Sequence, residues 1–166
     1  GPVYDVANAL TGSFTTVGAP TAGSTAFFTS GIEGASFSVN FTRGDGTNRL
    51  VVAREGAPVI FTPADGVDYN VSSTFGSGDN LGNNTFAIAD GNVSGASLTG
   101  LTPATTYHIA VFEYNGSATN TFYLTTPAQI LRGSATTISP PATSASALNF
   151  SAIDGHRATV SFTVGS

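Results

Sequence analysis

The sequence contains no cysteine, methionine, tryptophan or lysine. Without cysteine the chain has no disulfide, no thiolate nucleophile and no Cys-ligated metal site. Charged residues make up only 9% of the chain and the formal net charge is −5, so we expect no basic surface for nucleic acid. No apolar run approaches about 18 residues, so we also expect no membrane span. Such a composition is frequent among exported bacterial proteins, whereas small secreted eukaryotic domains more often carry disulfides.

An internal repeat is the most informative feature that is present. The segment GSFTTV at 12–17 returns as GSATTI at 133–138, and at the same offset 18–44 aligns with 139–165 without a gap. About 13 of the 33 aligned positions are identical. The identical pairs include Pro20 and Pro141, Val39 and Val160, Phe41 and Phe162, and Gly44 and Gly165.

This repetition divides the chain into three parts. Residues 1–17 are expected to be the tail of a preceding repeat, 18–138 a complete repeat, and 139–166 the head of a following one. We interpret Gly1-Pro2 as the remnant of a cleaved tag. Neighbouring repeats of the same chain are therefore the first partners to expect.

Short apolar segments that alternate with polar residues, separated by turns rich in Gly, Asn, Asp and Pro, predict an antiparallel β-sandwich. No window of about 11 residues carries a helical apolar stripe, so helix should be minor. The clearest alternation places six side chains in the interior: Phe37, Val39, Phe41, Tyr107, Ile109 and Val111. Weaker strands are predicted at 24–29, 57–62, 67–73, 85–89, 96–99, 119–124, 133–138, 147–151 and 158–164.

The run from Leu101 to Val111 has the pattern L-x-P-x-T-x-Y-x-I-x-V, which resembles the tyrosine corner of fibronectin type III domains. The resemblance implies a fibronectin type III or immunoglobulin-like sandwich. It also implies that Tyr107 buries its ring while its hydroxyl bonds to backbone upstream. Phe41 would then replace the tryptophan usual on the family's second strand.

Several further segments resemble a bacterial subfamily of these domains, repeated in large secreted or surface proteins. They are GDGxxRLVVAR at 44–54, PxDGxxY at 63–69, FGxG at 75–78, VFEYNG at 111–116 and YLT at 123–125. The resemblance covers one repeat from end to end and implies a secreted or bacterial cell-surface location. Because such folds host many functions, it predicts the fold more specifically than the activity.

The repeat is about 20 residues longer than an ordinary sandwich of about 100 residues. The excess lies between Arg54 and Thr85, which predicts an insertion around 55–85 with two extra short strands and a Gly/Asn-rich loop. Such an insertion serves either the structure or the binding of a ligand.

Candidates for catalysis are few. The two histidines, His108 and His156, lie near no recognisable nucleophile motif, and G-x-S-x-G does not occur. Glu113, between two aromatic residues, is the best single acid, but glycosidase chemistry needs a carboxylate pair. We expect a structural role for Glu113, a surface position for His108, no catalytic residue and no enzyme activity.

Two kinds of ligand remain open. Asp-rich turns offer the oxygen ligands that Ca²⁺ prefers, with Asp65 and Asp68 as the best candidates, although ordinary turns use the same residues. Calcium is the one cofactor that the sequence suggests. Glycan binding would need exposed aromatic rings, for which Tyr69, Phe75 and Tyr114 are the candidates.

The sequence therefore predicts a non-catalytic repeat module that acts as a spacer, a display unit or an adhesin segment. One alternative is a carbohydrate-binding module attached to an extracellular polysaccharide-degrading enzyme. Another is a polymer-forming subunit that exchanges strands with another copy, because an incomplete repeat such as 139–166 leaves strand edges and apolar side chains unpaired.

Overall fold

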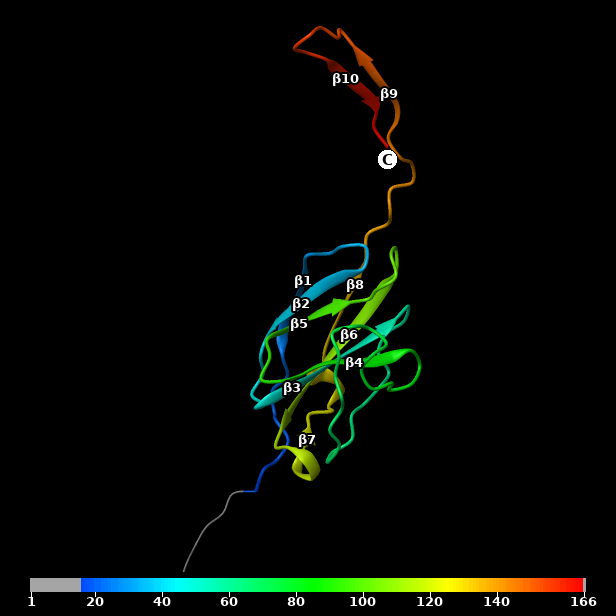
Figure 1. The fold of residues 1–166 in the computed structure, drawn as a ribbon. Coiled ribbons are helices and arrows are strands. Elements are labelled where there is room, and N and C mark those ends of the chain that lie inside the picture. Colours follow the sequence, from blue (N-terminus) through cyan, green and yellow to red (C-terminus); the bar gives the residue numbers. More distant parts are fainter. Residues whose placement is uncertain (1–15, 166) are drawn as a thin grey trace, which may run out of the picture.

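The chain folds into short β-strands joined by turns (Figure 1). The structure is a computed structural model that describes residues 16–165. The strands are β1 (Thr25–Ser30), β2 (Ser36–Thr42), β3 (Asn48–Glu55), β4 (Thr85–Gly91), β5 (Gly95–Thr99), β6 (Thr106–Asn115), β7 (Phe122–Tyr123), β8 (Leu131–Thr136), β9 (Ser146–Ser151) and β10 (Thr159–Thr163). The helical segments of this part of the chain are single 3₁₀ turns at Ala118–Asn120 and Pro127–Gln129.

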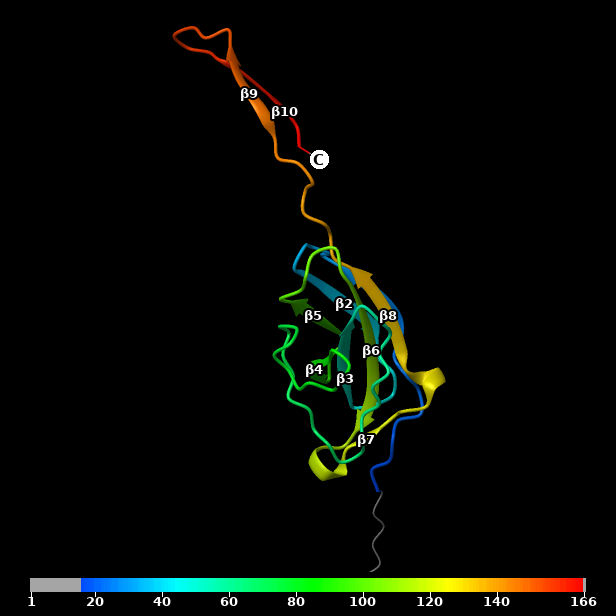
Figure 2. The ribbon, with the colours of Figure 1, turned by 90° about the vertical axis from the view of Figure 1, so that its right-hand side faces the viewer.

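Two antiparallel sheets form a sandwich (Figure 2). The smaller has the strand order β1-β2-β5, and the larger has the order β4-β3-β6, with β7 and β8 pairing in succession along the free edge of β6. The predicted all-β antiparallel sandwich is confirmed. The predicted strands at 24–29, 85–89 and 96–99 correspond to β1, β4 and β5, and the strand at 133–138 overlaps β8.

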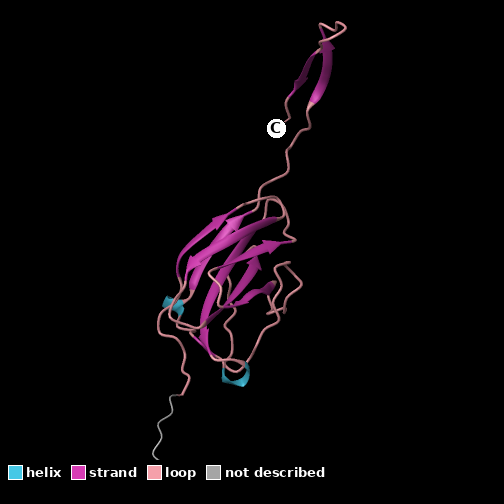
Figure 3. Cartoon of the chain, turned by 60° about the vertical axis from the view of Figure 1, so that its left-hand side comes forward, coloured by secondary structure: helices cyan, strands magenta, loops and turns pink. Residues whose placement is uncertain are grey.

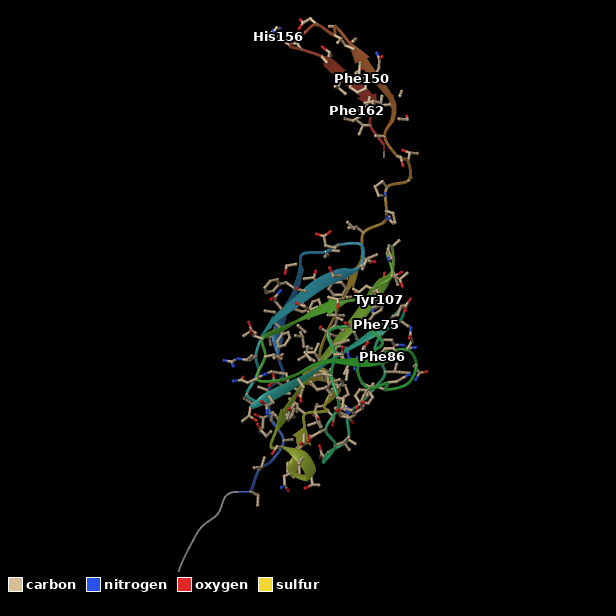
Figure 4. All side chains as sticks on the ribbon, viewed as in Figure 1. Phe75, Phe86, Tyr107, Phe150, His156 and Phe162 are labelled. Atoms are coloured by element: carbon tan, nitrogen blue, oxygen red, sulfur yellow. The ribbon has the colours of Figure 1, made fainter. Side chains whose placement is uncertain are left out.

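The main core lies between the two sheets. All six side chains predicted to face the interior are buried, with exposed fractions of 5% or less. Phe75 reaches this core from the long segment between β3 and β4 and packs edge-on against Phe86 and Tyr107, with ring centroids 5.0 Å apart in each pair (Figure 4). The alternation of apolar residues therefore located the inner face correctly.

A second core covers the outer face of the larger sheet. Leu50 and Val52 of β3 and Phe112 of β6 point to this side, because successive side chains of a strand alternate between faces. The inserted segment 56–84 crosses this face and contributes Val59, Phe61, Tyr69 and Leu81 to the cluster. The predicted insertion is thus a cover for a sheet that is apolar on both sides.

The inserted segment contains no regular strand, so the predicted strands at 57–62 and 67–73 are wrong. Its ladder contacts are isolated bridges, Thr74 with Thr99 and Asn80 with Phe86. Pro58 lacks an amide proton. The carbonyls of Pro58 and Val59 accept hydrogen bonds from the side chains of Arg54 and Arg132 instead of from a partner strand. The predicted strand at 119–124 is also shortened to β7, because 118–120 form a 3₁₀ turn.

The last two strands stand apart from the sandwich. β9 and β10 pair with each other, beyond an extended segment that contains Pro140 and Pro141 (Figure 3). The predicted strands at 147–151 and 158–164 are confirmed. The predicted preceding tail, 1–17, lies almost wholly outside the described residues.

Candidate functional site

The tyrosine corner is present at the start of β6. The ring of Tyr107 is buried, and its hydroxyl accepts a hydrogen bond from the backbone amide of Thr102 at 3.0 Å. This contact ties the turn before β6 to the strand itself. The orientation predicted for Tyr107 is confirmed.

Glu113 is the centre of a buried polar network at one end of the core. Its carboxylate accepts hydrogen bonds from the hydroxyl of Ser24 at 2.5 Å and from the amides of Gly44 and Gly46 at 2.7 and 3.1 Å. It also pairs with Arg49, the distance from Nε to Oε2 being 3.0 Å. Because Ser24 precedes β1 and Gly44 follows β2, this one carboxylate joins the two sheets.

Arg49 has no donor left for a ligand. Its Nε bonds to Glu113, Nη1 donates to the side-chain oxygen of Asn92 and the carbonyl of Thr47, and Nη2 donates to the carbonyls of Gly44 and Gly46. A guanidinium has five N–H donors, so this one is saturated. The structural role expected for Glu113 is confirmed, and Arg49 is the partner that the sequence did not reveal.

The segment leading into β1 is held by Asp45. Its carboxylate accepts hydrogen bonds from the amides of Thr21 and Ala22, and from the Thr21 hydroxyl at 2.6 Å. The bond from the Thr21 hydroxyl is the main cause that lowers the pKa of Asp45 below its usual value of 3.8. Since 18–23 is the predicted joint between repeats, Asp45 fixes the direction in which the chain enters the sandwich.

The two calcium candidates serve as hydrogen-bond acceptors at the end of the larger sheet. Asp65 accepts from the amide of Tyr123 at 2.8 Å, and Asp68 accepts from the hydroxyl of Thr121 at 3.2 Å. Within residues 16–165 no group of three or more His, Cys, Asp or Glu side chains could hold a metal ion. Calcium binding at Asp65 and Asp68 stays a prediction.

The three candidate glycan-binding rings take part in packing. Tyr114 is only 6% exposed, and its hydroxyl donates to Asp90 at 2.6 Å. Burial first, and then this bond, raises the pKa of Tyr114 above its ordinary value. Tyr69 packs against Phe61, while Phe75 belongs to the main core. Tyr114 therefore offers no exposed ring face, and glycan binding at Tyr69 and Phe75 stays a prediction.

The histidines lie far apart in the fold. His108 is half-buried on the outer face of β6, and His156 is exposed in the turn between β9 and β10 (Figure 4). In that turn, the Asp154 carboxylate accepts hydrogen bonds from the backbone amides of His156 and Arg157, and these bonds shape the turn. No pair of acid and base side chains is assembled around either histidine in the part of the chain that the structure describes.

The hairpin β9–β10 repeats the geometry of the hairpin β1–β2. Thr25 pairs with Thr42 and Phe28 with Asn40, with a bulge between. In the second hairpin the matching residues of the sequence repeat pair in the same way: Ser146 with Thr163 and Asn149 with Ser161, again around a bulge. The bulge residues Ala26 and Ala147 share a left-handed backbone, with φ of 53° and 54°.

The environments of the two hairpins differ sharply. Val39 and Phe41 are 0% and 5% exposed inside the sandwich, whereas their equivalents Val160 and Phe162 are 51% and 57% exposed. Phe150, on the neighbouring strand, is 55% exposed (Figure 4). The hairpin therefore presents an apolar face of the kind that the complete repeat buries, and this face is the candidate interface of the chain.

No protein-family model matches the chain, and no curated protein does. None of the described residues form a helix that is long and apolar enough to cross a membrane.

The solved structures that are similar to the chain are β-sandwiches. A computationally redesigned β-sandwich protein shares 17% identity over 70% of this chain and 90% of its own, with a TM-score of 0.44. The fibronectin type III domain of human collagen XX shares 15% identity over 76% of this chain and 100% of its own, with a TM-score of 0.41. A fibronectin type III domain of human contactin 1 shares 12% identity over 85% of this chain and 99% of its own, with a TM-score of 0.44. The chain's own strand order and tyrosine corner give it a fibronectin type III-like sandwich fold.

Proposed function

We propose that this chain is part of a tandem array of β-sandwich repeats that acts as a non-catalytic spacer and display module. The observation that carries the proposal is the hairpin β9–β10, which repeats the register, bulge and left-handed alanine of β1–β2 at matching positions. An isolated two-stranded hairpin is marginal in water and needs further strands to cover its apolar face.

The polar groups of the sandwich support a structural module. The buried carboxylate, Glu113, and the buried guanidinium, Arg49, neutralise each other and bond to turns. Asp45 holds the segment that enters the sandwich, and two prolines stiffen the segment that leaves it. Such joints suit a chain whose repeats keep a defined spacing. Together with the cysteine-free composition, they lead us to propose a secreted or cell-surface protein, in which the module serves as a spacer or an adhesin segment.

A chain with residues 18–138 duplicated in tandem tests this proposal. Completing the second repeat gives the hairpin the strands that it lacks, so we expect two sandwiches with equal unfolding midpoints. Small-angle X-ray scattering should show a largest dimension close to twice that of a single repeat. A compact particle, or a second copy that stays unfolded, would contradict the proposal.

A second candidate function is strand exchange between copies, and the exposed face of β9–β10 favours it. In that case the hairpin of one molecule would pair with another molecule, because unpaired strand edges can add strands from a partner. Light scattering on the full chain, described below, separates this function from that of a monomeric spacer.

A further inference from the structure

A groove of about 250 Å³ lies on the outer face of the larger sheet, between β6, β8 and the start of the inserted segment. Val59 forms part of one wall, while His108, Arg132 and Ser134 are among the side chains that line it. At this size the groove is smaller than pockets that enclose a whole small molecule, which measure about 300–1,000 Å³. It can admit a single chemical group.

The strand register gathers basic side chains beside this groove. Arg54 of β3 is directly opposite His108 of β6, and His108 is directly opposite Ser134 of β8. Directly opposed Cβ atoms in antiparallel strands are about 4.5–5.5 Å apart. Arg132 lies two residues before Ser134 and therefore on the same face. Two of the five arginines of a chain with net charge −5 thus lie on the same face of the sheet, on the two strands that flank β6.

Both arginines keep unused donors. Arg54 Nη1 donates to the carbonyl of Pro58, and Arg132 Nη1 donates to the carbonyl of Val59, each at 2.7 Å. These bonds fix the wall of the groove. Arg54 Nε is buried without any hydrogen-bond partner. The ion pair within residues 16–165 is that of Arg49 with Glu113, so no carboxylate of this part of the chain forms an ion pair with Arg54 or Arg132.

Arg49 does not share this state. Arg49 lines a groove with Arg43, but its five donors are all occupied and Glu113 neutralises it. The groove at Arg132 therefore combines a guanidinium that has free donors and no ion pair with His108 and Ser134, whereas in the groove at Arg49 only Arg43 has free donors.

We propose that the groove at Arg132 and His108 binds a single oxyanion group, a carboxylate or a sulfate, carried by an acidic sugar or a similar small ligand. A guanidinium presents its N–H donors in a planar fork that matches such a group, and bonds between charged partners are the stronger ones. His108 and the hydroxyl of Ser134 add donors on the neighbouring strands.

The test is a titration of the ¹⁵N-labelled full chain, followed by amide and arginine Nε chemical shifts. The probes are sodium sulfate and sodium glucuronate, with total ionic strength held constant by sodium chloride and with glucose as an uncharged control. We expect saturable shifts at Val59, His108, Gly133 and Ser134. Stronger binding of glucuronate would assign the groove to carboxylates, and stronger binding of sulfate would assign it to sulfate esters.

Variants decide between a built site and a general effect of charge. Arg132→Gln removes an exposed guanidinium and should weaken the binding of the anion about tenfold or more, the usual effect of losing one charge-assisted hydrogen bond. The matched control, Arg43→Gln, removes another exposed arginine and should leave the affinity unchanged. His108→Gln, on a different strand, gives a second test if Arg132→Gln disturbs the fold. Shifts that never saturate, or equal weakening in Arg43→Gln, would overturn the proposal.

Discussion

Arg49 and Glu113 face each other across β3 and β6, and both side chains are almost completely buried. A buried ion pair repays the cost of desolvation only when its remaining donors and acceptors are also satisfied. Here the Glu113 carboxylate also accepts hydrogen bonds from the Ser24 hydroxyl and from two glycine amides. The Arg49 guanidinium donates hydrogen bonds to Asn92 and to turn carbonyls. The pair therefore connects both sheets and the turn after β2.

Replacing Glu113 with Gln should destabilise the sandwich by about 3–5 kcal/mol, because it leaves the buried charge of Arg49 unpaired. Chemical denaturation measures the loss. Glu33→Gln, which changes an exposed acid, is the control and should cost less than about 0.5 kcal/mol. A loss below about 1 kcal/mol for Glu113→Gln would show that the pair is not sequestered from water.

The two hairpins offer a matched pair of substitutions. Phe41→Ala should cost about 3–5 kcal/mol through lost packing and a cavity in the main core. Phe162→Ala, at the equivalent and exposed position, should leave the unfolding midpoint of the sandwich unchanged. Equal losses would mean that the second hairpin packs as tightly as the first.

Tyr107→Phe should cost about 1 kcal/mol, because the partly buried amide of Thr102 loses its acceptor. Hydrogen exchange provides a second, local measurement. The amide of Thr102 should exchange faster in the variant, while amides in β3 keep their protection. An unchanged exchange rate at Thr102 would contradict the hydrogen bond.

Acid should loosen the entry to the sandwich. The pKa of Asp45 is depressed in the folded chain, so its contribution to stability is present above the unfolded value near 3.8. That contribution is lost as the pH falls through the lower folded pKa. The amide shifts of Thr21 and Ala22 should follow this titration in an NMR experiment, and they should be flat over the same range in Asp45→Asn. A titration midpoint above 3.8 for Asp45 would contradict the lowered pKa.

The full chain and residues 18–138 should differ in association. If copies exchange strands, the exposed face with Phe150, Val160 and Phe162 makes residues 1–166 self-associate as concentration rises, whereas 18–138 stays monomeric. Size-exclusion chromatography with light scattering measures both. The double variant Phe150→Ser and Phe162→Ser should restore the monomer. If both unmodified chains are monomers at all concentrations, strand exchange is excluded and the spacer proposal stands.

The sequence by itself determined those features that depend on short-range patterns. Alternation identified Phe37 to Phe41 as an inward-facing strand, because side chains of a strand point to opposite faces in turn. The tyrosine corner was equally predictable, since Tyr107 and Thr102 are only five residues apart. The repeat was visible by direct alignment, and it predicted both strands of the hairpin β9–β10.

The tertiary structure alone decided which distant residues meet. Arg49 and Glu113 are 64 residues apart, and only the pairing of β3 with β6 shows that they form one ion pair. The row from Arg54 through His108 to Ser134 likewise depends on the register of three strands. The apolar residues of the inserted segment led to the prediction of strands, but in the structure these residues cover the outer face of the larger sheet. The segment's tertiary partner is a sheet face, against which side chains can pack without a ladder of backbone hydrogen bonds.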